Sequence, residues 1–439
     1  SSPTDIGTRR ELFVDDLLIE ELDGLSLKLS HPERREVVFT FDQPFEDNVA
    51  APLSFAQFDN TIRMYYRAYI DREQEGEDIQ YLGIAESTDG GISFDRPDMG
   101  MTKFDGSSSN SLIFFGGPPR VPPAFIDTNP DCLPHQRFKG LTCKWKELWP
   151  MCSQDGINWT PMSDTPIDMS GTFDTVNTAF WDTNTNCYRS FTRYFENFDE
   201  VTGELDVLGP EPVAVRAIQS STSKDFIHWT EPVPHTYTDD NTDMQLYTNG
   251  TLPCPGAEHI YLSFCMRYEQ ERIVDENHLY PGVSDAVFMA SRDAVHWTRY
   301  REAWVRPGID PLNWSERNNI PTWGIVETSE TEWSMYIEEH YRRSELPPRV
   351  RRLSIRPHGF ASLHADYDGG ECLTRPILFS GSEIKLNFST SAAGSVKISI
   401  CNTNGSPVAG FAYDDMDPMF GDELDRPVKW HSGSDISSL

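Results

Sequence analysis

Positive charge is scarce in this sequence. Its 439 residues include 37 lysines and arginines against 69 aspartates and glutamates, and the net charge is −32. Proteins that wrap a polyanion neutralise it with lysine and arginine, so this balance excludes a nucleic-acid-binding protein unless the basic residues gather in one place. A strongly acidic surface also suits salty surroundings, where screening weakens the repulsion between its charges.

Long apolar runs and helical periodicity are also missing. No run approaches the roughly 18 apolar residues of a membrane-spanning helix, and the first twenty residues lack the basic start and apolar stretch of a signal peptide. No segment sustains apolar residues at positions i, i+3 and i+4, and glycine, proline, asparagine and aspartate are scattered throughout. We therefore expect no membrane span and an all-β fold.

Cysteine is present without the spacing of a metal or redox motif. The eight cysteines include no Cys-x-x-Cys pair and no group with histidine at zinc-ligand spacing. Their even number allows disulfides, but several lie in apolar, strand-like runs, where a reduced buried cysteine is more common. The oxygen-rich segment 127–131 lacks the spaced ligands and final glutamate of an EF-hand loop, and we interpret it as a turn. We expect no cofactor, and a structural calcium ion is not indicated.

What the sequence does contain is a recurring phrase that ends in an aromatic residue. Copies occupy residues 87–94, 153–159, 223–229 and 291–297, and a degenerate fifth spans 355–360. In the four clear copies a serine is followed two residues later by an aspartate, whose side chain can accept hydrogen bonds from nearby backbone N–H groups in a tight reversal. The closing phenylalanine or tryptophan can pack between neighbouring units. We interpret the phrase as architecture rather than chemistry.

Each repeat reads as four short strands. In the fourth unit the predicted strands are Gln245–Leu252, His259–Arg267, Ala286–Ser291 and Trp297–Tyr300, and a Pro-Cys-Pro-Gly turn follows the first of them. Regular repetition at this spacing indicates a repeat architecture, and five units of four antiparallel strands are typical of a five-bladed β-propeller. We assign residues 1–368 to this propeller, with 1–45 completing or bracing it.

The repeat stops after residue 368. Residues 383–388 and 395–401 alternate polar and apolar side chains and are joined by polar turns, which predicts a β-sandwich module over 369–439. No closing strand is evident over 435–439, so the module is expected to be truncated. It would serve either as a carbohydrate-binding domain or as a brace for the propeller.

A basic residue stands beside aromatic residues at the end of each predicted second strand. These residues are Arg67, Arg193, Arg267 and Arg342, with Lys144 and Lys146 around Trp145 in the second unit. Guanidinium groups suit carboxylate or sulfate, and aromatic rings suit sugar faces. The pattern indicates an anionic carbohydrate, unless each arginine pairs with a neighbouring acid and closes the blades.

The predicted starts of the first strands supply carboxylates and amides. The residues in question are Glu46, Asp47, Asn48, Asp127, Asp174, Asn177, Asp243, Asn249, Arg317, Asn318 and Asn319. Carboxylates that converge on a sugar-sized cavity allow one to act as a protonated acid and another as an ionised base or nucleophile. We therefore predict a glycoside hydrolase.

Specific residues follow from this interpretation. The catalytic candidates are Asp174, Glu339 and Glu46, each at a predicted channel mouth within an apolar or aromatic run where burial would raise a pKa. Asp47 is the rival of Glu46, because adjacent strand residues point to opposite sides. The substrate-binding candidates are Arg67, Asn177, Arg193, Asn249, Arg267, Arg317, Asn318, His340 and Arg342. A histidine beside aromatic residues is also commonly a structural hydrogen-bonding group.

Six segments resemble a known group of proteins. They are residues 11–16, 127–131, 179–182, 317–321, 339–342 and 391–396. Through them the sequence resembles, over almost its whole length, glycoside-hydrolase-like five-bladed propeller proteins of planctomycetes and marine bacteria. That resemblance implies a secreted or periplasmic protein.

The group is more distantly similar to glycoside hydrolase families 32, 43 and 117, which implies an exo-acting hydrolase of small oligosaccharides. The motifs of those families, Trp-Met-Asn-Asp-Pro-Asn-Gly and Arg-Asp-Pro, do not occur here. The expected substrate is a sulfated or uronic-acid-bearing algal or cell-wall oligosaccharide. The stereochemical outcome, the assignment of acid and base, and the oligomeric state stay open. The alternative is a lectin-like propeller that binds the same sugar without catalysis.

Overall fold

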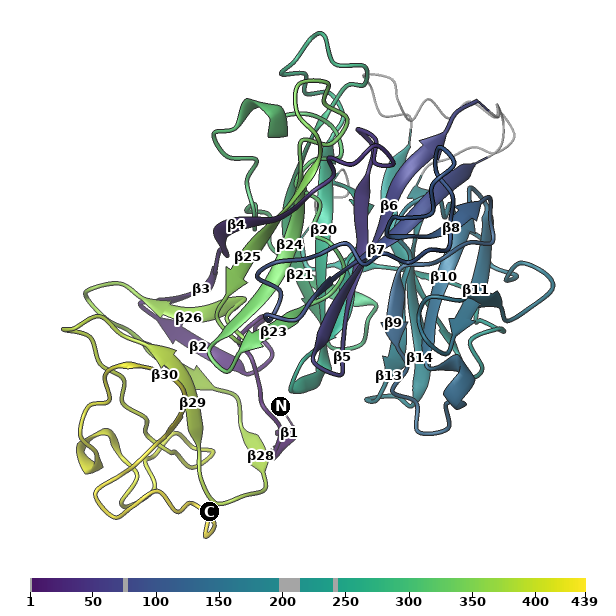
Figure 1. Ribbon diagram of the computed structural model, residues 1–439. Helices are drawn as coiled ribbons and strands as arrows, with labels where there is room; N and C mark the ends of the chain where they lie inside the picture. Colours follow the sequence, from purple (N-terminus) through teal and green to yellow (C-terminus); the bar gives the residue numbers. More distant parts are fainter. Residues whose placement is uncertain (1, 74–77, 197–213, 240–243) are drawn as a thin grey trace. The chain divides into compact units, whose positions relative to one another are not determined.

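The computed structural model describes residues 2–73, 78–196, 214–239 and 244–439 (Figure 1). Over these ranges the regular structure consists of strands and three one-turn 3-10 helices, η1 (Pro134–Gln136), η2 (Pro311–Asn313) and η3 (Tyr413–Asp415). In the same ranges we find no helix that is long and apolar enough to cross a membrane. The prediction of an all-β fold is confirmed.

The chain divides into two compact units. One comprises His31–Arg356, and the other combines the residues up to Ser30 with Pro357–Leu439. This division differs from the boundary expected after residue 368, because the first thirty residues and residues 357–368 group with the C-terminal segment.

The larger unit is a five-bladed β-propeller, as predicted (Figure 1). Blade one consists of β5 (Ala51–Phe58), β6 (Thr61–Asp71), β7 (Ile79–Ser87) and β8 (Leu112–Gly116). Blade two consists of β9 (Ala124–Ile126), β10 (Phe138–Lys144), β11 (Glu147–Ser153) and β12 (Thr160–Pro161). Blade three consists of β13 (Thr178–Asp182), β14 (Cys187–Glu196), β15 (Val215–Ser223) and β16 (Val233–Pro234). First strands of neighbouring blades lie against one another, as β5 does with β9 and β9 with β13.

Blade four has an interrupted first strand. Its strands are β18 (Gln245–Thr248), β19 (Thr251–Cys254), β20 (Ala257–Glu269), β21 (Val283–Ser291) and β22 (His296–Arg299), and β17 (Thr236–Tyr237) runs parallel to β22. Both β18 and β19 pair with the long second strand β20.

Blade five is completed by the N-terminal part of the chain. Its strands are β23 (Val326–Ser329), β24 (Glu332–Glu339), β25 (Arg349–Ile355) and β4 (Glu33–Thr40), and β25 pairs antiparallel with β4, with Val350 opposite Phe39. The degenerate fifth phrase at 355–360 therefore does not lead into a fourth strand. Residues 33–40 form β4, the fourth strand of blade five.

The four clear phrases form the reversals after the third strands. In blade three, Oδ1 of Asp225 accepts hydrogen bonds from the backbone N–H groups of Ile227 (2.9 Å) and His228 (2.8 Å), and the Ser223 hydroxyl accepts one from Phe226 N–H (2.9 Å). Blades one, two and four repeat this pattern around Asp89, Asp155 and Asp293.

The smaller unit contains four two-stranded pairs. They are β1 (Thr4–Gly7) with β28 (Ile377–Phe379), β2 (Ile19–Asp23) with β27 (Glu371–Thr374), β3 (Leu25–Leu29) with β26 (Ala361–Ala365), and β29 (Lys385–Ser389) with β30 (Asp422–Pro427). Their core includes Met416, Met419, Val428, Trp430 and Ile436.

The C-terminal segment forms one of the two strands predicted for it. The predicted strand 383–388 corresponds to β29, but 395–401 forms only isolated bridges, Val396 to Met419 and Cys401 to Pro407. A β-sandwich module stays a prediction. All eight cysteines are free thiols, so the even cysteine count does not reflect disulfide pairing.

Candidate active site

One end of the propeller gathers most of the predicted site residues. In an antiparallel blade the start of the first strand lies beside the end of the second strand, so the segments before the first strands meet the ends of β6, β14 and β24 there. Five arginines and four tyrosines form a continuous network at this end. This arginine–tyrosine cluster comprises Arg67, Arg193, Arg216, Arg317, Arg342, Tyr247, Tyr268, Tyr280 and Tyr341.

Tyr247, on β18, connects three of the arginines. The guanidinium carbons of Arg216, Arg193 and Arg317 lie 4.5, 5.3 and 5.5 Å from the centre of its ring. Cation–π contacts at such distances stabilise a guanidinium that burial has partly stripped of water. The ring of Tyr268 packs edge-on against Tyr247 at 5.4 Å.

Tyr341 connects Arg67, Arg317 and Arg342. Its hydroxyl accepts a hydrogen bond from Nη2 of Arg67 (3.1 Å), and its ring lies 5.1 Å from the guanidinium carbon of Arg317 and 5.3 Å from that of Arg342. Arg67 also donates to the backbone carbonyl of Val49, at the start of blade one. The network thus spans blades one, three, four and five.

Strained backbone is concentrated beside this cluster. Arg317, Asn319, His340 and Arg342 all have positive φ, between 55° and 63°. Residues other than glycine rarely adopt this conformation, and it persists where surrounding structure holds it, commonly at functional sites. Asn318 supplies that hold, because its side chain accepts a hydrogen bond from Tyr341 N–H (2.8 Å) and donates to Ser315 Oγ (2.9 Å).

Glu338, near the end of β24, is the unusual acid of this end. Glu338 is only 2% exposed, and its Oε1 has no hydrogen-bonding partner among the described residues. Burial raises the pKa of Glu338 well above its ordinary value, although the charges of Arg67 and Arg317 act to lower it; the nearby Glu316 raises the pKa further. Burial thus favours the protonated form of Glu338 even though several cations act on it.

The predicted acid Glu339 is directed elsewhere. Its Oε1 accepts from Nε of Arg351 (2.7 Å) and Arg349 (3.0 Å), and Oε2 accepts from Asn313 (2.9 Å). Burial alone would raise the pKa of Glu339, but the hydrogen bond and charge of Arg351 and the charge of Arg349 lower it. Because neighbouring strand residues point to opposite sides, Glu338 lies with the arginine–tyrosine cluster and Glu339 forms a structural ion-pair network.

The pair Glu46 and Asp47 divides in the same way. Glu46 is buried and accepts from Arg96 (2.7 and 2.9 Å) and from the hydroxyl of Tyr66 (3.0 Å). Asp47 accepts backbone N–H groups from Val49 and Ile70, both at 3.0 Å. Burial raises the pKa of Asp47, those hydrogen bonds and the charge of Arg67 oppose the rise, and Asp47 is therefore the member nearer the cluster.

Asp174 contacts the cluster through Arg193. Its side chain is 46% exposed and forms an ion pair with Arg193, whose own side chain is buried and also donates to Thr172 Oγ1 (3.3 Å). Asn177, three residues on, donates to the carbonyls of Phe173 and Thr175, while its buried Oδ1 has no partner among the described residues.

Several predicted binding residues are engaged within the protein. Arg267 is bound to both carboxylate oxygens of Asp285 (2.8 and 2.5 Å), on the side of β20 away from Tyr268. Asn249 accepts from Thr178 Oγ1 (2.7 Å), and His340 Nε2 lies 2.6 Å from Asp310. The alternative that arginines pair with acids therefore applies to Arg267, and also to Arg193 with Asp174 and Arg342 with Glu316. Asp243 lies outside the described residues.

Six residues of the site were missed from the sequence. They are Tyr247, Tyr268, Tyr280, Arg216, Glu316 and Glu338, and Arg216 lies on the third strand β15 rather than on a second strand. Only Glu338 had a usable signal, since its neighbour Glu339 was chosen and the two alternate across β24.

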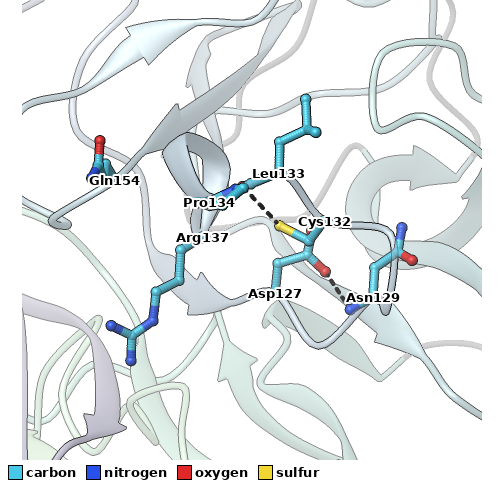
Figure 2. A pocket seen from close by; sticks show the side chains of 7 residues that line it. All are labelled: Asp127, Asn129, Cys132, Leu133, Pro134, Arg137 and Gln154. Carbon is cyan, nitrogen blue, oxygen red and sulfur yellow. Dashed lines mark hydrogen bonds between the residues drawn. The ribbon is translucent and has the colours of Figure 1, made fainter.

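The other end of blade two contains an open pocket of about 420 Å³ (Figure 2). It is lined by Asp127, Asn129, Cys132, Leu133, Pro134, Arg137 and Gln154. Asp127 follows the end of β9 and does not start a first strand, so it lies away from the arginine–tyrosine cluster. Its Oδ2 accepts from Lys139 and from the Tyr188 hydroxyl, both at 2.6 Å.

Segment 127–131 forms the expected turn, in which Asn129 N–H donates to Asp127 Oδ1 (2.9 Å) and Asp131 N–H donates to Asn129 Oδ1 (3.0 Å). Across the described ranges, no group of three or more histidine, cysteine, aspartate or glutamate side chains is arranged to hold a metal ion.

No protein-family model and no curated protein matches the sequence. Solved structures with a similar fold include an N-acetylgalactosamine deacetylase from F. plautii in complex with blood group B trisaccharide (12% identity, 81% of this chain and 94% of that chain, TM-score 0.44). Others are an α-L-arabinofuranosidase from Fusarium graminearum (11%, 74% and 98%, 0.41) and a β-1,2-mannobiose phosphorylase from Listeria innocua (11%, 75% and 99%, 0.42).

Proposed function

We propose that the protein is a glycoside hydrolase that acts on an anionic oligosaccharide, with Glu338 as the general acid. The observation that carries this proposal is the buried carboxyl of Glu338, whose Oε1 has no hydrogen-bonding partner among the described residues and whose pKa is raised by burial against the charges of Arg67 and Arg317. Structural acids of this protein, such as Glu46 and Glu339, are saturated with donors. A carboxyl kept protonated at neutral pH is what protonation of a glycosidic oxygen requires.

The second carboxyl group in this proposal is Asp174. It forms an ion pair with Arg193, and its side chain is 46% exposed, so it is accessible to water. Glu338 would give its proton to the leaving oxygen as the glycosidic bond breaks. As a base, Asp174 would take a proton from the water whose hydroxyl bonds to the anomeric carbon; as a nucleophile, it would first bond to that carbon, and water would then replace it and return a proton to Glu338. Asp174 pairs with Arg193 and the charge of Glu338 acts on Arg317, and both arginines contact the ring of Tyr247.

The cluster itself supports an anionic sugar as substrate. A chain with a net charge of −32 places five arginines at one end of its propeller, interleaved with tyrosine rings. Arginine recognises carboxylate and sulfate through paired N–H donors, and tyrosine offers an apolar face with a polar edge to a sugar ring.

The first experiment is a product screen. The purified protein is incubated with uronate-containing and sulfated oligosaccharides, and released sugars are separated by chromatography; monosaccharide alone would indicate exo-action. Hydrolysis should fall by about 10²–10⁴-fold in Glu338→Gln and should be lost in Asp174→Asn. Glu339→Gln, one residue away, is the matched control and should retain the wild-type rate per folded molecule.

The outcomes separate the enzyme from the lectin-like alternative. If no substrate is cleaved but one ligand raises the melting temperature, the protein is a binding propeller and the hydrolase proposal fails. If Glu339→Gln abolishes hydrolysis and Glu338→Gln does not, the assignment of the acid is wrong.

A further inference from the structure

Arg317 differs from the other arginines of the cluster in what surrounds it. Its backbone N–H donates to Ser284 Oγ (3.1 Å), but its Nε is buried and has no hydrogen-bonding partner among the described residues. Its guanidinium lies over the rings of Tyr247 (5.5 Å) and Tyr341 (5.1 Å), and the charges of Glu316 and Glu338 also act on it. Arg193 and Arg342 have carboxylate partners, and Arg67 has a carbonyl and a hydroxyl.

A buried guanidinium usually has an anionic or hydrogen-bonding partner, because desolvation of an unpaired charge is costly. The backbone conformation of Arg317 is instead fixed by its neighbours. Its positive φ is maintained by the Asn318 side chain, which joins residues 315–318 to the backbone of Tyr341. A cation fixed in this way loses little freedom when an anion binds.

We propose that Arg317 is the binding subsite for the carboxylate of a uronic acid residue of the substrate, next to Glu338. This inference rests on the proposed function only for the role of Glu338. Electron-rich tyrosine rings flank the guanidinium and disfavour an anion that approaches over them. A planar carboxylate can approach in the plane of the guanidinium and bind its paired N–H donors. A tetrahedral sulfate would direct oxygens out of that plane.

The neighbouring acid provides a readout of binding. Arg317 is one of the two main cations that lower the pKa of Glu338 against the effect of burial. A carboxylate bound to Arg317 offsets that cation, so the pKa of Glu338 rises and the complex takes up protons wherever Glu338 is partly ionised. A purely structural arginine would produce no such coupling.

The test is calorimetric binding of glucuronate and galacturonate, with glucose and glucose 6-sulfate as comparisons, in buffers of different ionisation enthalpy. We expect a uronate to bind at least about tenfold more tightly than glucose and the sulfate ester, as loss of a charged hydrogen bond implies. At a pH where Glu338 is partly ionised, proton uptake should accompany binding and should disappear in Glu338→Gln. Arg317→Gln should lose the uronate preference, and Arg317→Lys should weaken it if the glutamine variant does not fold.

Arg137→Gln is the control, because Arg137 is exposed at the other end of blade two. Equal binding of glucose, equal binding of the sulfate ester, or unchanged uronate binding in folded Arg317→Gln would each overturn the subsite. Uronate binding without any hydrolysis would leave the subsite standing and refute the hydrolase. Hydrolysis of neutral glycosides alone would refute the subsite and leave the hydrolase.

Discussion

At the scale of single residues, the pKa values of two adjacent glutamates are shifted in opposite directions. Glu338 is buried without a hydrogen-bond donor at Oε1, and its pKa rises, whereas Glu339 has three donors and its pKa falls. A raised pKa in the folded state means that the native protein binds a proton that the unfolded chain releases. The two residues should therefore affect stability with opposite dependence on pH.

We predict that Glu338→Gln stabilises the protein increasingly as pH rises. The free energy of unfolding of the wild type falls as pH rises above 4.5, the ordinary pKa of glutamate, because Glu338 ionises more readily in the unfolded chain than in the native protein. The melting temperature of Glu338→Gln should exceed that of the wild type at pH 8 and match it near pH 4. A difference that does not change with pH would contradict the raised pKa.

Glu339→Gln should behave in the opposite way. Its lowered pKa stabilises the native state above the unfolded value and loses that effect as pH falls. The variant should be destabilised at pH 7 by about 2 kcal/mol, the order expected for hydrogen bonds to a charged group, and the deficit should shrink in acid. Denaturant titrations at pH 7 and pH 4 would measure both values.

At the scale of the element, the aspartate turns are the repeated stabilising unit. Burial opposes ionisation of Asp225, but hydrogen bonds from His228, Ile227 and Ser223 together lower its pKa to about 2, and Asp89, Asp155 and Asp293 also have pKa values of about 2. Protonation of these carboxylates should therefore weaken the turns.

Acid should therefore weaken the propeller over a defined range. The ordinary pKa of aspartate is 3.8, and that of Asp225 in the folded protein is about 2. The stabilisation from the charged carboxylate is therefore complete above pH 3.8 and is lost as pH falls from 3.8 to about 2. Asp225→Ala should cost about 1–2 kcal/mol at pH 7 and much less at pH 2. The exposed neighbour serves as control, and Lys224→Ala should change stability little at either pH.

The residue after the aspartate depends on the blade. This position has positive φ in each turn and is Gly156 in blade two, Phe226 in blade three and Ala294 in blade four. A Cβ at Gly156 would lie 2.4 Å from the Tyr65 hydroxyl and 2.9 Å from Cδ1 of Phe138.

Gly156→Ala should consequently destabilise the protein by more than about 2 kcal/mol, through both overpacking and backbone strain. Chemical denaturation of this variant beside Ala294→Gly would show the contrast, since blade four already accommodates a methyl group. A neutral Gly156→Ala would mean that Tyr65 moves freely, contrary to its hydrogen bond to the Gly156 carbonyl (2.8 Å).

At the scale of the whole propeller, closure depends on one strand far away in sequence. β4 is the fourth strand of blade five and covers the edge of β25, which the C-terminal side of the chain leaves unpaired. An uncovered strand edge invites association with other chains.

We predict that a fragment starting at His31 and ending at Arg356 folds, and that one starting at Phe41 does not. The shorter fragment lacks β4 and should aggregate or unfold at lower denaturant, whereas the longer one should show a single cooperative transition. Size-exclusion chromatography and denaturant titration of the pair would decide. Equal behaviour of the two fragments would show that β4 is dispensable.

Much of the fold was determined by local sequence. The aspartate phrases specify their own hydrogen bonds within a few residues, and the alternation of apolar side chains specifies strands, so four of the five reversals and the number of blades could be predicted. The closing strand could not be assigned in this way, because β4 and β25 are more than three hundred residues apart and pair only in the folded chain.

The site was determined by tertiary structure to a larger degree. Sequence alone located polar residues at strand ends, among them Arg67, Arg193, Arg317 and Arg342, and the structure connects these four arginines through tyrosine rings. It could not decide between Glu338 and Glu339, since a strand has two faces and only packing determines which one meets the cations. Nor could it find Tyr247 or Arg216, whose role depends on contacts between blades that no local pattern encodes.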